Sequence, residues 1–326
     1  VVARVRSRRR GETSKHPQTR IAQPATRQLC IASEQSSQLW ICRIATARAY
    51  FALFKTMSTS TAAATSTAAA ATTADTQSSP KKRVLCLHGW RTNTFILEAQ
   101  TMFLRSKLPR SIELVMLQAP IKTDKPADAD IARVKGPYYQ WWIDAIVAKG
   151  PEDIEASVHA GVAYAAKYVE EHGPFDAVLG FSQGAVMATL LTRHLVQKLN
   201  PDAPIEPGQQ LKLPWQGNIC VCGSAIPSKA WETEYIRNPL SIPTLHVIGE
   251  RDKIRFKSEK LLKMYDSNKT RLFVHELGHR FPRMGDPLYN DIAAHMTDIV
   301  YGKVQYPEPA LAAASAEDGT ANAVAE

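Results

Sequence analysis

The feature that most constrains the fold is an apolar run that leads through Gly-x-Ser-x-Gly into a helix-like run. Residues 177–179 are apolar, Gly180, Ser182 and Gly184 follow, and residues 185–199 are typical of a strong helix. Side chains two positions before and after the serine would collide with so tight a turn, so glycine is needed at both, and the hydroxyl projects clear of the sheet. The helix directs its amino-terminal amides toward the same place. This context favours a catalytic nucleophile at Ser182 over an ordinary glycine-rich turn.

Runs typical of strands and helices alternate through the central region. Strands are predicted at residues 84–87, 112–117, 177–179, 218–222, 244–248 and 272–275. Helices are predicted at residues 94–108, 154–171, 185–199, 258–265 and 287–300. This order predicts the α/β class, with a doubly wound, mostly parallel sheet of about six strands and helices on both faces.

An acid and a base are expected downstream of the serine, each at the carboxyl end of a strand. Asp252 follows the apolar run 245–248, and His279 follows the run 272–275. The carboxyl ends of parallel strands share one edge of the sheet, where the Ser182 turn lies and where ligands bind. The chain order of serine, acid and histidine is the one that accompanies such turns. We therefore interpret His279 as the base and Asp252 as the residue that orients it.

Other side chains compete for these two roles. Glu250 is the nearest alternative to Asp252, and Asp266 is less suitable because it ends a predicted helix. The competing histidines lie in or at the end of strands, which favours hydrogen-bonded core positions for His88, His246 and His275.

The loop after the first strand has the sequence His88-Gly89-Trp90. Such a loop can direct a backbone N–H group at a developing oxyanion. We expect the donors to be the amides of Trp90 and Gln183, and we expect His88 to be structural.

Residues 275–279 match His-Glu-x-x-His, a zinc signature that works when both histidines lie on one helical face. The residues before this run are typical of a strand, Gly278 weakens a helix, and Pro282 breaks one. Gly285 stands where a third histidine ligand would be needed. A zinc peptidase using His275 and His279 therefore remains only an alternative, and we expect no metal and no cofactor.

The formal net charge of +9 lies in the amino-terminal segment. Residues 1–55 contain eleven basic and two acidic residues, whereas the remaining residues contain 29 of each. The folded part is therefore neutral, which gives no support to nucleic-acid binding.

The two ends of the chain look unsuited to packing. Residues 1–80 form a basic and then Ser/Thr/Ala-rich extension, and residues 304–326 form an Ala-rich tail, so we expect both to be disordered around one domain at 81–303. The mildly apolar stretch within the extension is too short and too charged to span a membrane. It is either a targeting segment resembling a mitochondrial transit peptide or a stretch upstream of a true start at Met57.

Five cysteines are too few and too irregularly spaced for a disulfide framework or a metal site: Cys30, Cys42, Cys86, Cys220 and Cys222. Buried free thiols in a reducing compartment are expected, which places the protein in the cytoplasm, with the nucleus open, or in mitochondria if residues 1–55 are genuine. Because alternate strand residues share a face, Cys220 and Cys222 are predicted to point the same way.

A long connection at residues 118–152 ends in an aromatic cluster, Tyr138, Tyr139, Trp141 and Trp142. Long connections in compact domains are often functional. The cluster either lines an acyl pocket or belongs to the core and anchors the connection.

Several blocks together resemble the fungal-type family of serine hydrolases known as FSH. They are Val84–Trp90, the Tyr138–Trp142 cluster, the GPFD run at 173–176, residues 180–185 and residues 278–282, and the resemblance covers roughly residues 82–301. It implies an α/β-hydrolase fold without a large cap domain, and esterase or thioesterase activity on small acyl substrates. It also implies Ser182, Asp252 and His279 as the triad. One departure is that Ile254-Arg255 stand where family members often have an apolar residue and proline. A hydrolase-fold binding protein without turnover is the third hypothesis, and the sequence does not determine the oligomeric state.

Overall fold

The computed structural model describes residues 80–134, 136–206 and 209–306. The expectations for the amino-terminal extension, for Cys30 and Cys42, and for nearly all of the tail lie outside these residues. Within them, no helix has the length and apolar character needed to cross a membrane.

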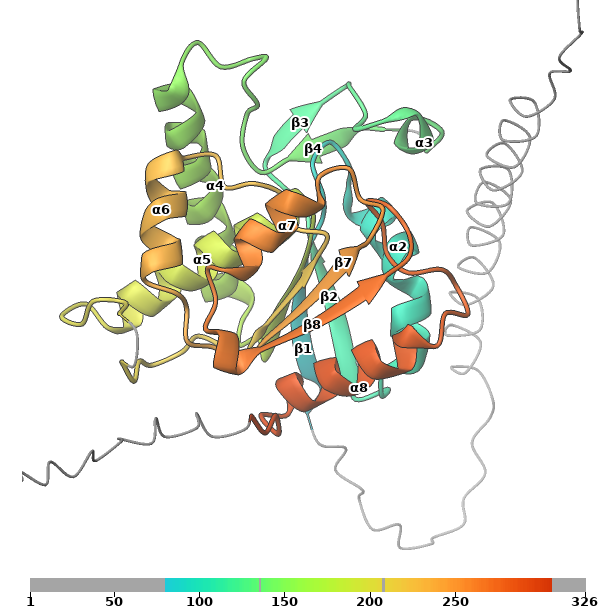
Figure 1. Cartoon of the computed structure of the whole chain (residues 1–326). Helices are drawn as coiled ribbons and strands as arrows, with labels where there is room; N and C mark the ends of the chain where they lie inside the picture. The colour runs from blue at the N-terminus through green and yellow to red at the C-terminus, as the bar shows by residue number, and fades with distance from the viewer. Residues whose placement is uncertain (1–79, 135, 207–208, 307–326) are drawn as a thin grey trace, which may run out of the picture. The chain divides into compact units, whose positions relative to one another are not determined.

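Six parallel strands form the central sheet (Figure 1). Their order across the sheet is β2-β1-β5-β6-β7-β8. The bounds are β1 Lys82–Leu87, β2 Ile112–Leu117, β5 Ala177–Phe181, β6 Asn218–Val221, β7 Thr244–Gly249 and β8 Thr270–His275. Each strand overlaps a predicted one, so the prediction of a mostly parallel sheet of about six strands is confirmed.

Helices cover both faces of this sheet, as expected for a doubly wound fold (Figure 1). One face carries α4 Pro151–His172, α5 Gln183–Leu199, α6 Lys229–Arg237 and α7 Arg255–Leu262, and the other carries α2 Thr94–Lys107 and α8 Leu288–Val300. Alternate residues of β1 separate between two cores: Leu85 and Leu87 pack toward α5, whereas Val84 and Cys86 pack toward α2 and α8. This is the arrangement of the α/β-hydrolase fold.

The connection between β2 and α4, where no strand or helix was predicted, contains regular structure. It contains the antiparallel pair β3 Ile121–Thr123 and β4 Tyr138–Gln140, and the short helix α3 Ala129–Ala132. These elements are too small to constitute a cap domain, in agreement with the expectation.

Three other local differences are found. Helix α6 and the 3-10 helix η1 Ser267–Lys269 were not predicted. Helix α7 is displaced by three residues toward the amino terminus at both ends, relative to the predicted helix. Helix α7 begins early because Arg255 directly follows the turn that Asp252 closes, where the Arg255 amide donates to the Asp252 carbonyl.

The prediction that Cys220 and Cys222 point the same way is wrong. Cys220 packs in the core beneath α5, whereas Cys222 packs in the opposite core. Strand β6 ends at Val221, and Cys222 has φ 45°, so the two-residue alternation of a strand no longer applies to it. The expectation of buried free thiols is met by the three described cysteines, Cys86, Cys220 and Cys222.

Candidate active site

The turn between β5 and α5 holds Ser182 at φ 54° and ψ −114°, a conformation that L-residues rarely adopt. A Cβ atom on Gly180 would lie 2.2 Å from the carbonyl oxygen of Gly184, and one on Gly184 would lie 2.1 Å from the carbonyl oxygen of Leu87. These contacts are with backbone atoms, which cannot move aside. The sequence of the turn therefore has a steric cause, and it places the serine hydroxyl at the carboxyl edge of the sheet.

Ser182, His279 and Asp252 lie in a hydrogen-bonded row. His279 Nε2 is 2.9 Å from Ser182 Oγ, and His279 Nδ1 is 2.7 Å from Asp252 Oδ2. The Asp252 side chain is fully buried, and its other oxygen accepts the amide N–H of Ile254 at 2.9 Å. Ser182 is 8% exposed, whereas the His279 side chain is 31% exposed, so a substrate can reach the serine–histidine pair.

The loops that carry Asp252 and His279 are in direct backbone contact. A Cβ atom on Gly249, the last residue of β7, would lie 2.3 Å from the carbonyl oxygen of Gly278. The Arg251 amide donates to the Leu277 carbonyl at 3.0 Å. Residues 27 positions apart in the sequence are thereby brought to hydrogen-bond distance.

One amide expected to bind an oxyanion follows Gly89 in the chain, and the other follows Ser182. Gly89, which precedes Trp90, approaches so closely that a Cβ atom there would lie 3.4 Å from the Ser182 Cβ. Gln183 opens α5 directly after the serine. Within the described ranges, neither the Trp90 nor the Gln183 amide donates to a protein acceptor. Both donors are therefore available to a ligand beside the serine.

The His88 side chain holds the Trp90 loop in place through hydrogen bonds. It is fully buried, its Nδ1 lies 2.8 Å from the Gly89 carbonyl, and its Nε2 accepts the Ala119 amide at 3.0 Å. Burial lowers the pKa of His88 to about 4, which leaves the ring neutral and able to accept this hydrogen bond. The structural role expected for His88 agrees with these contacts.

In the described part of the chain, none of the other competing side chains is hydrogen-bonded to the serine hydroxyl, which pairs with His279. His246 is buried in β7, where burial lowers its pKa to about 3, and His275 accepts the Leu277 amide through Nδ1. The Glu250 side chain is exposed, and Asp266 caps η1.

The helical context that a zinc signature requires is not formed. His275 ends strand β8, and residues 276–280 are a series of bends. In the part of the chain that the structure describes, the one group of three potential metal ligands is Cys222, Asp252 and His279, which excludes His275. The spacing of the two histidines therefore does not bring them to one metal.

The aromatic cluster is mostly buried. Tyr138, Trp141 and Trp142 are 0–7% exposed, and Tyr139 is half-buried. Trp141 Nε1 donates to the His88 carbonyl at 2.8 Å, and the Trp141 amide donates to Gln183 Oε1 at 2.9 Å. Trp141 therefore links the Trp90 loop to the first residue of α5, which favours the core role for it. A pocket-lining role for the cluster stays a prediction.

Two contributors to the site were not identified from the sequence. Arg91, at φ 51°, forms a partly buried ion pair of 2.7 Å with Asp144 and so ties the Trp90 loop to the long connection. The Cys222 thiol lies within 4.8 Å of ligand atoms of Asp252 and His279, and burial, with the Asp252 charge second, raises its pKa to about 12. The pairing of Arg91 with Asp144 had no sequence signal, and strand alternation placed Cys222 on the wrong face.

Comparison with known proteins identifies the family of the chain. The family described as "Serine hydrolase (FSH1)" matches residues 77–288. The chain is 33% identical to esterase C25G4.2 of Caenorhabditis elegans over 217 residues, which is 64% of this chain and 89% of the relative. It is 30% identical to family of serine hydrolases 3 of Saccharomyces cerevisiae over 222 residues, with 63% and 79% covered.

A solved structure, that of esterase PE8, is 22% identical, with a TM-score of 0.45, and the match covers 67% of this chain and 93% of that one. The family match spans well over half of the chain and includes the Ser182 turn, the Trp90 loop and the loops of Asp252 and His279. The chain therefore belongs to the FSH1 family of serine hydrolases.

Proposed function

We propose that the protein hydrolyses acyl esters or thioesters of small molecules through Ser182, His279 and Asp252. In the first step, His279 Nε2 takes the proton of Ser182 as Oγ bonds to the substrate carbonyl carbon. The tetrahedral oxyanion accepts hydrogen bonds from the amides of Trp90 and Gln183. His279 then gives its proton to the departing alcohol or thiol, which leaves an acyl group on Ser182.

The second half of the reaction repeats these transfers with water. His279 Nε2 takes a proton from water, the resulting oxygen attacks the acyl carbon, and the carboxylic acid leaves as the proton returns to Ser182. Asp252 accepts the Nδ1–H of His279 throughout, which keeps Nε2 free as acceptor and stabilises the imidazolium. Helix α5 contributes its positive end to the stabilisation of the oxyanion.

The observation that carries this proposal is the pair of distances, 2.9 Å from Ser182 Oγ to His279 Nε2 and 2.7 Å from Nδ1 to Asp252 Oδ2. A binding protein without turnover would have no need of a serine held at positive φ beside a histidine whose second nitrogen is paired with a buried carboxylate. Both Asp252 and His279 come from loops fixed by backbone contacts, so the geometry does not depend on flexible side chains.

Labelling with a fluorophosphonate probe tests the proposal, together with turnover of p-nitrophenyl esters and acyl thioesters of graded chain length. The Ser182→Ala variant is expected to lose labelling and to retain less than about 10⁻⁴ of the wild-type turnover. Ser106→Ala is the matched control, because Ser106 is exposed on α2 and bonds only the Phe103 carbonyl. Ser182→Ala turnover within tenfold of wild type would exclude Ser182 as nucleophile, and absence of labelling in the wild type would favour a binding protein.

We also propose that the protein functions in a reducing compartment, the cytoplasm in the first instance. Support comes from the described cysteines, which are buried free thiols and form no disulfide among themselves. Fluorescence imaging of the full-length chain carrying a carboxyl-terminal tag tests this, and secretion or import into mitochondria would contradict it.

A further inference from the structure

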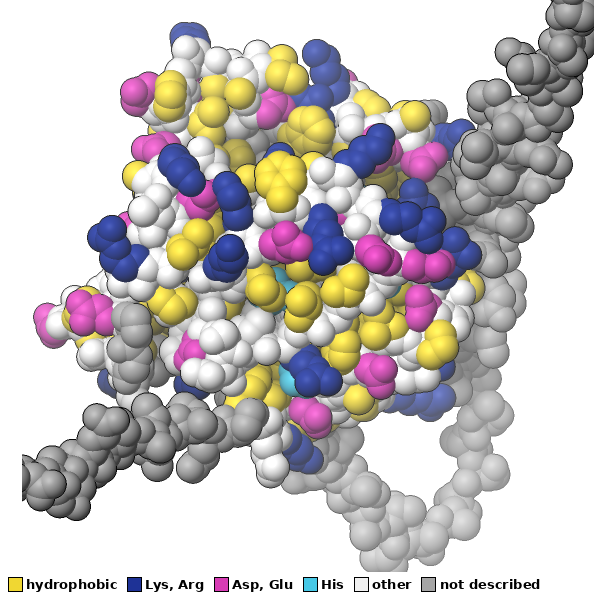
Figure 2. Space-filling view, viewed as in Figure 1, with side chains coloured by type: hydrophobic (Ala, Val, Ile, Leu, Met, Phe, Trp, Pro, Cys, Tyr) yellow, Lys and Arg dark blue, Asp and Glu magenta, His cyan; other side chains and the backbone are white. Residues whose placement is uncertain are grey.

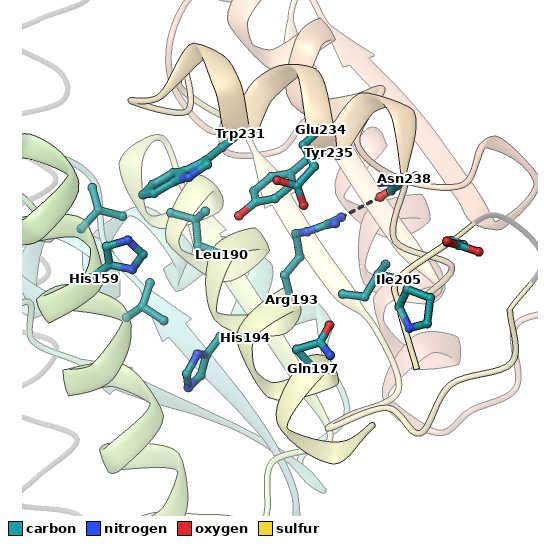
Figure 3. A pocket seen from close by; sticks show the side chains of 14 residues that line it. His159, Leu190, Arg193, His194, Gln197, Ile205, Trp231, Glu234, Tyr235 and Asn238 are labelled. Carbon is teal, nitrogen blue, oxygen red and sulfur yellow. Dashed lines mark hydrogen bonds between the residues drawn. The ribbon is translucent and has the colours of Figure 1, made fainter. Parts of the chain in front are cut away.

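We propose that a cavity between α4, α5 and α6 is a second binding site, which takes a monocarboxylate with an apolar body. The cavity has a volume of about 400 Å³, within the range of small-molecule sites. Figure 3 shows Arg193 projecting from α5 into the space between the helices, with Tyr235 beside it. The proposal does not depend on the catalytic role of Ser182.

The cavity is separate from the serine. Its walls come from the middle of α4, from the second half of α5 and from α6, whereas Ser182 lies immediately before α5. Arg193 is eleven residues after Ser182, so at the rise of an α-helix the two lie about 16 Å apart along the axis. A ligand in this cavity therefore occupies none of the space beside Ser182.

Arg193 gives the cavity its chemical selectivity. The residue is 6% exposed, and one guanidinium nitrogen donates to the Asn238 carbonyl at 2.7 Å (Figure 3). The face of the guanidinium lies 3.9 Å from the ring centroid of Tyr235. No salt bridge joins the Arg193 guanidinium to a carboxylate of the described residues, although the exposed Glu234 is close enough to raise the pKa of Arg193 through space. A buried guanidinium is rare without a carboxylate partner.

Burial without a paired anion is unfavourable for this cation. Burial lowers the pKa of Arg193, and the neighbouring Tyr235 and Glu234 only partly oppose that effect. Guanidinium groups remain charged and bind carboxylates through two parallel N–H donors. Because the cavity borders the guanidinium, a ligand carboxylate placed there would supply the missing partner.

Part of the remaining wall suits an apolar body, whereas the rest is polar and includes His194, Gln197, Glu206 and Glu234. Leu190 and Val162 are buried aliphatic side chains of α5 and α4, and Trp231 packs edge-on against His159 at 5.1 Å between ring centroids. An aryl or short alkyl group placed between these side chains would cover apolar surface while its carboxylate meets Arg193. An anion without such a body, for example phosphate, would make only the Arg193 contact.

Isothermal titration calorimetry of the full-length chain with 4-phenylbutanoate tests the proposal. Arg193→Gln is expected to weaken binding at least about tenfold, the loss typical of a charge-assisted hydrogen bond. The affinity of wild-type protein for the neutral 4-phenylbutanamide should be lower than its affinity for 4-phenylbutanoate by a similar factor. The same decrease is expected for inorganic phosphate. Arg237→Gln is the matched control, because Arg237 is exposed at the end of α6 and does not line the cavity.

A second variant tests the proposal independently in case Arg193→Gln does not fold. Ile205 lies on the loop side of the cavity and is only partly buried, so Ile205→Trp fills the space without changing a helix. Thermal unfolding of each variant is measured alongside, and Ile205→Trp is expected to lose affinity as Arg193→Gln does. The proposal is overturned by no binding at millimolar 4-phenylbutanoate, by unchanged affinity in the folded variants, or by equal affinity for phosphate.

Discussion

The substitution Asp252→Asn tests the proposed mechanism most sharply. In the structure, one oxygen of Asp252 accepts the Ile254 amide at 2.9 Å, and the other lies 2.7 Å from His279 Nδ1. In the variant, the asparagine oxygen keeps the Ile254 bond, so its NH₂ group faces the histidine. Nδ1 must then accept, the proton moves to Nε2, and Nε2 can no longer take the proton of Ser182.

The loss should be large because Asp252 is the hydrogen-bond acceptor that the described part of the chain places against His279 Nδ1. The same change in a serine protease costs about 10⁴ in kcat, and we expect a decrease of about 10²–10⁴ here. The assay is steady-state hydrolysis of a p-nitrophenyl ester, with circular dichroism to show that the fold is kept. Since the Asp252 side chain is fully buried and Asn has the same shape, the variant should remain folded.

Glu276→Gln is the matched control, because Glu276 lies between the two histidines of the zinc signature. Its exposed side chain forms ion pairs with Arg251 and Arg283 at 3.4 and 3.5 Å. Each such exposed pair contributes less than about 1 kcal/mol to the free energy of unfolding. Activity should stay within several-fold of wild type, and phenanthroline should have no effect. An inactive Glu276→Gln together with an active Asp252→Asn would refute the triad and favour metal chemistry.

Three further predictions follow from the fold. Gly184→Ala places a Cβ atom 2.1 Å from a backbone oxygen, so the melting temperature should fall by roughly 6 °C or more, as at least about 3 kcal/mol of overpacking implies. Gly150→Ala, whose Cβ would meet only a flexible side-chain end, should change it little, and equal shifts would refute the steric argument. Burial lowers the pKa of His88 to about 4 and of His246 to about 3, from 6.5 in each case. Their contribution to stability is therefore present above pH 6.5 and lost as the pH falls toward 4, by about 1.4 kcal/mol per pH unit for each proton taken up on unfolding. Urea unfolding of His246→Phe should show a shallower decline than wild type, and identical slopes would contradict this. A chain beginning at Met57 should fold and keep wild-type turnover, because the described domain begins at residue 80; loss of soluble expression would show that the removed segment packs on the domain.

The main elements of the fold were predictable because their patterns are long. Helix α4, with apolar residues at helical spacing over 22 residues, and the fully buried strand β5 are examples. Helix α6 was missed because its nine residues are mostly polar, and β3 and β4 because three residues carry no periodicity. These elements depend on packing against the rest of the domain rather than on local sequence.

Within the candidate site, sequence order placed the three proposed catalytic residues at one edge of the sheet, where the structure brings them to hydrogen-bond distance. What could not be predicted were contacts made by backbone geometry outside regular elements. Cys222 faces the triad because its φ is positive, and Arg91 meets Asp144 across 53 positions. Neither a strand pattern nor a motif encodes such contacts.

The contact between Gly249 and Gly278 joins the acid loop and the base loop into one block. Because the two loops are in backbone contact, they cannot move apart to accommodate substrates of different size. We expect differences in substrate preference to come from other parts of the domain. The connection at 118–150, with its small hairpin, reaches the site through Trp141 and Arg91 without contributing a proton-transfer group. We therefore expect the protein to be modular: grafting this connection between family members should exchange chain-length preference while the intrinsic reactivity of the serine persists.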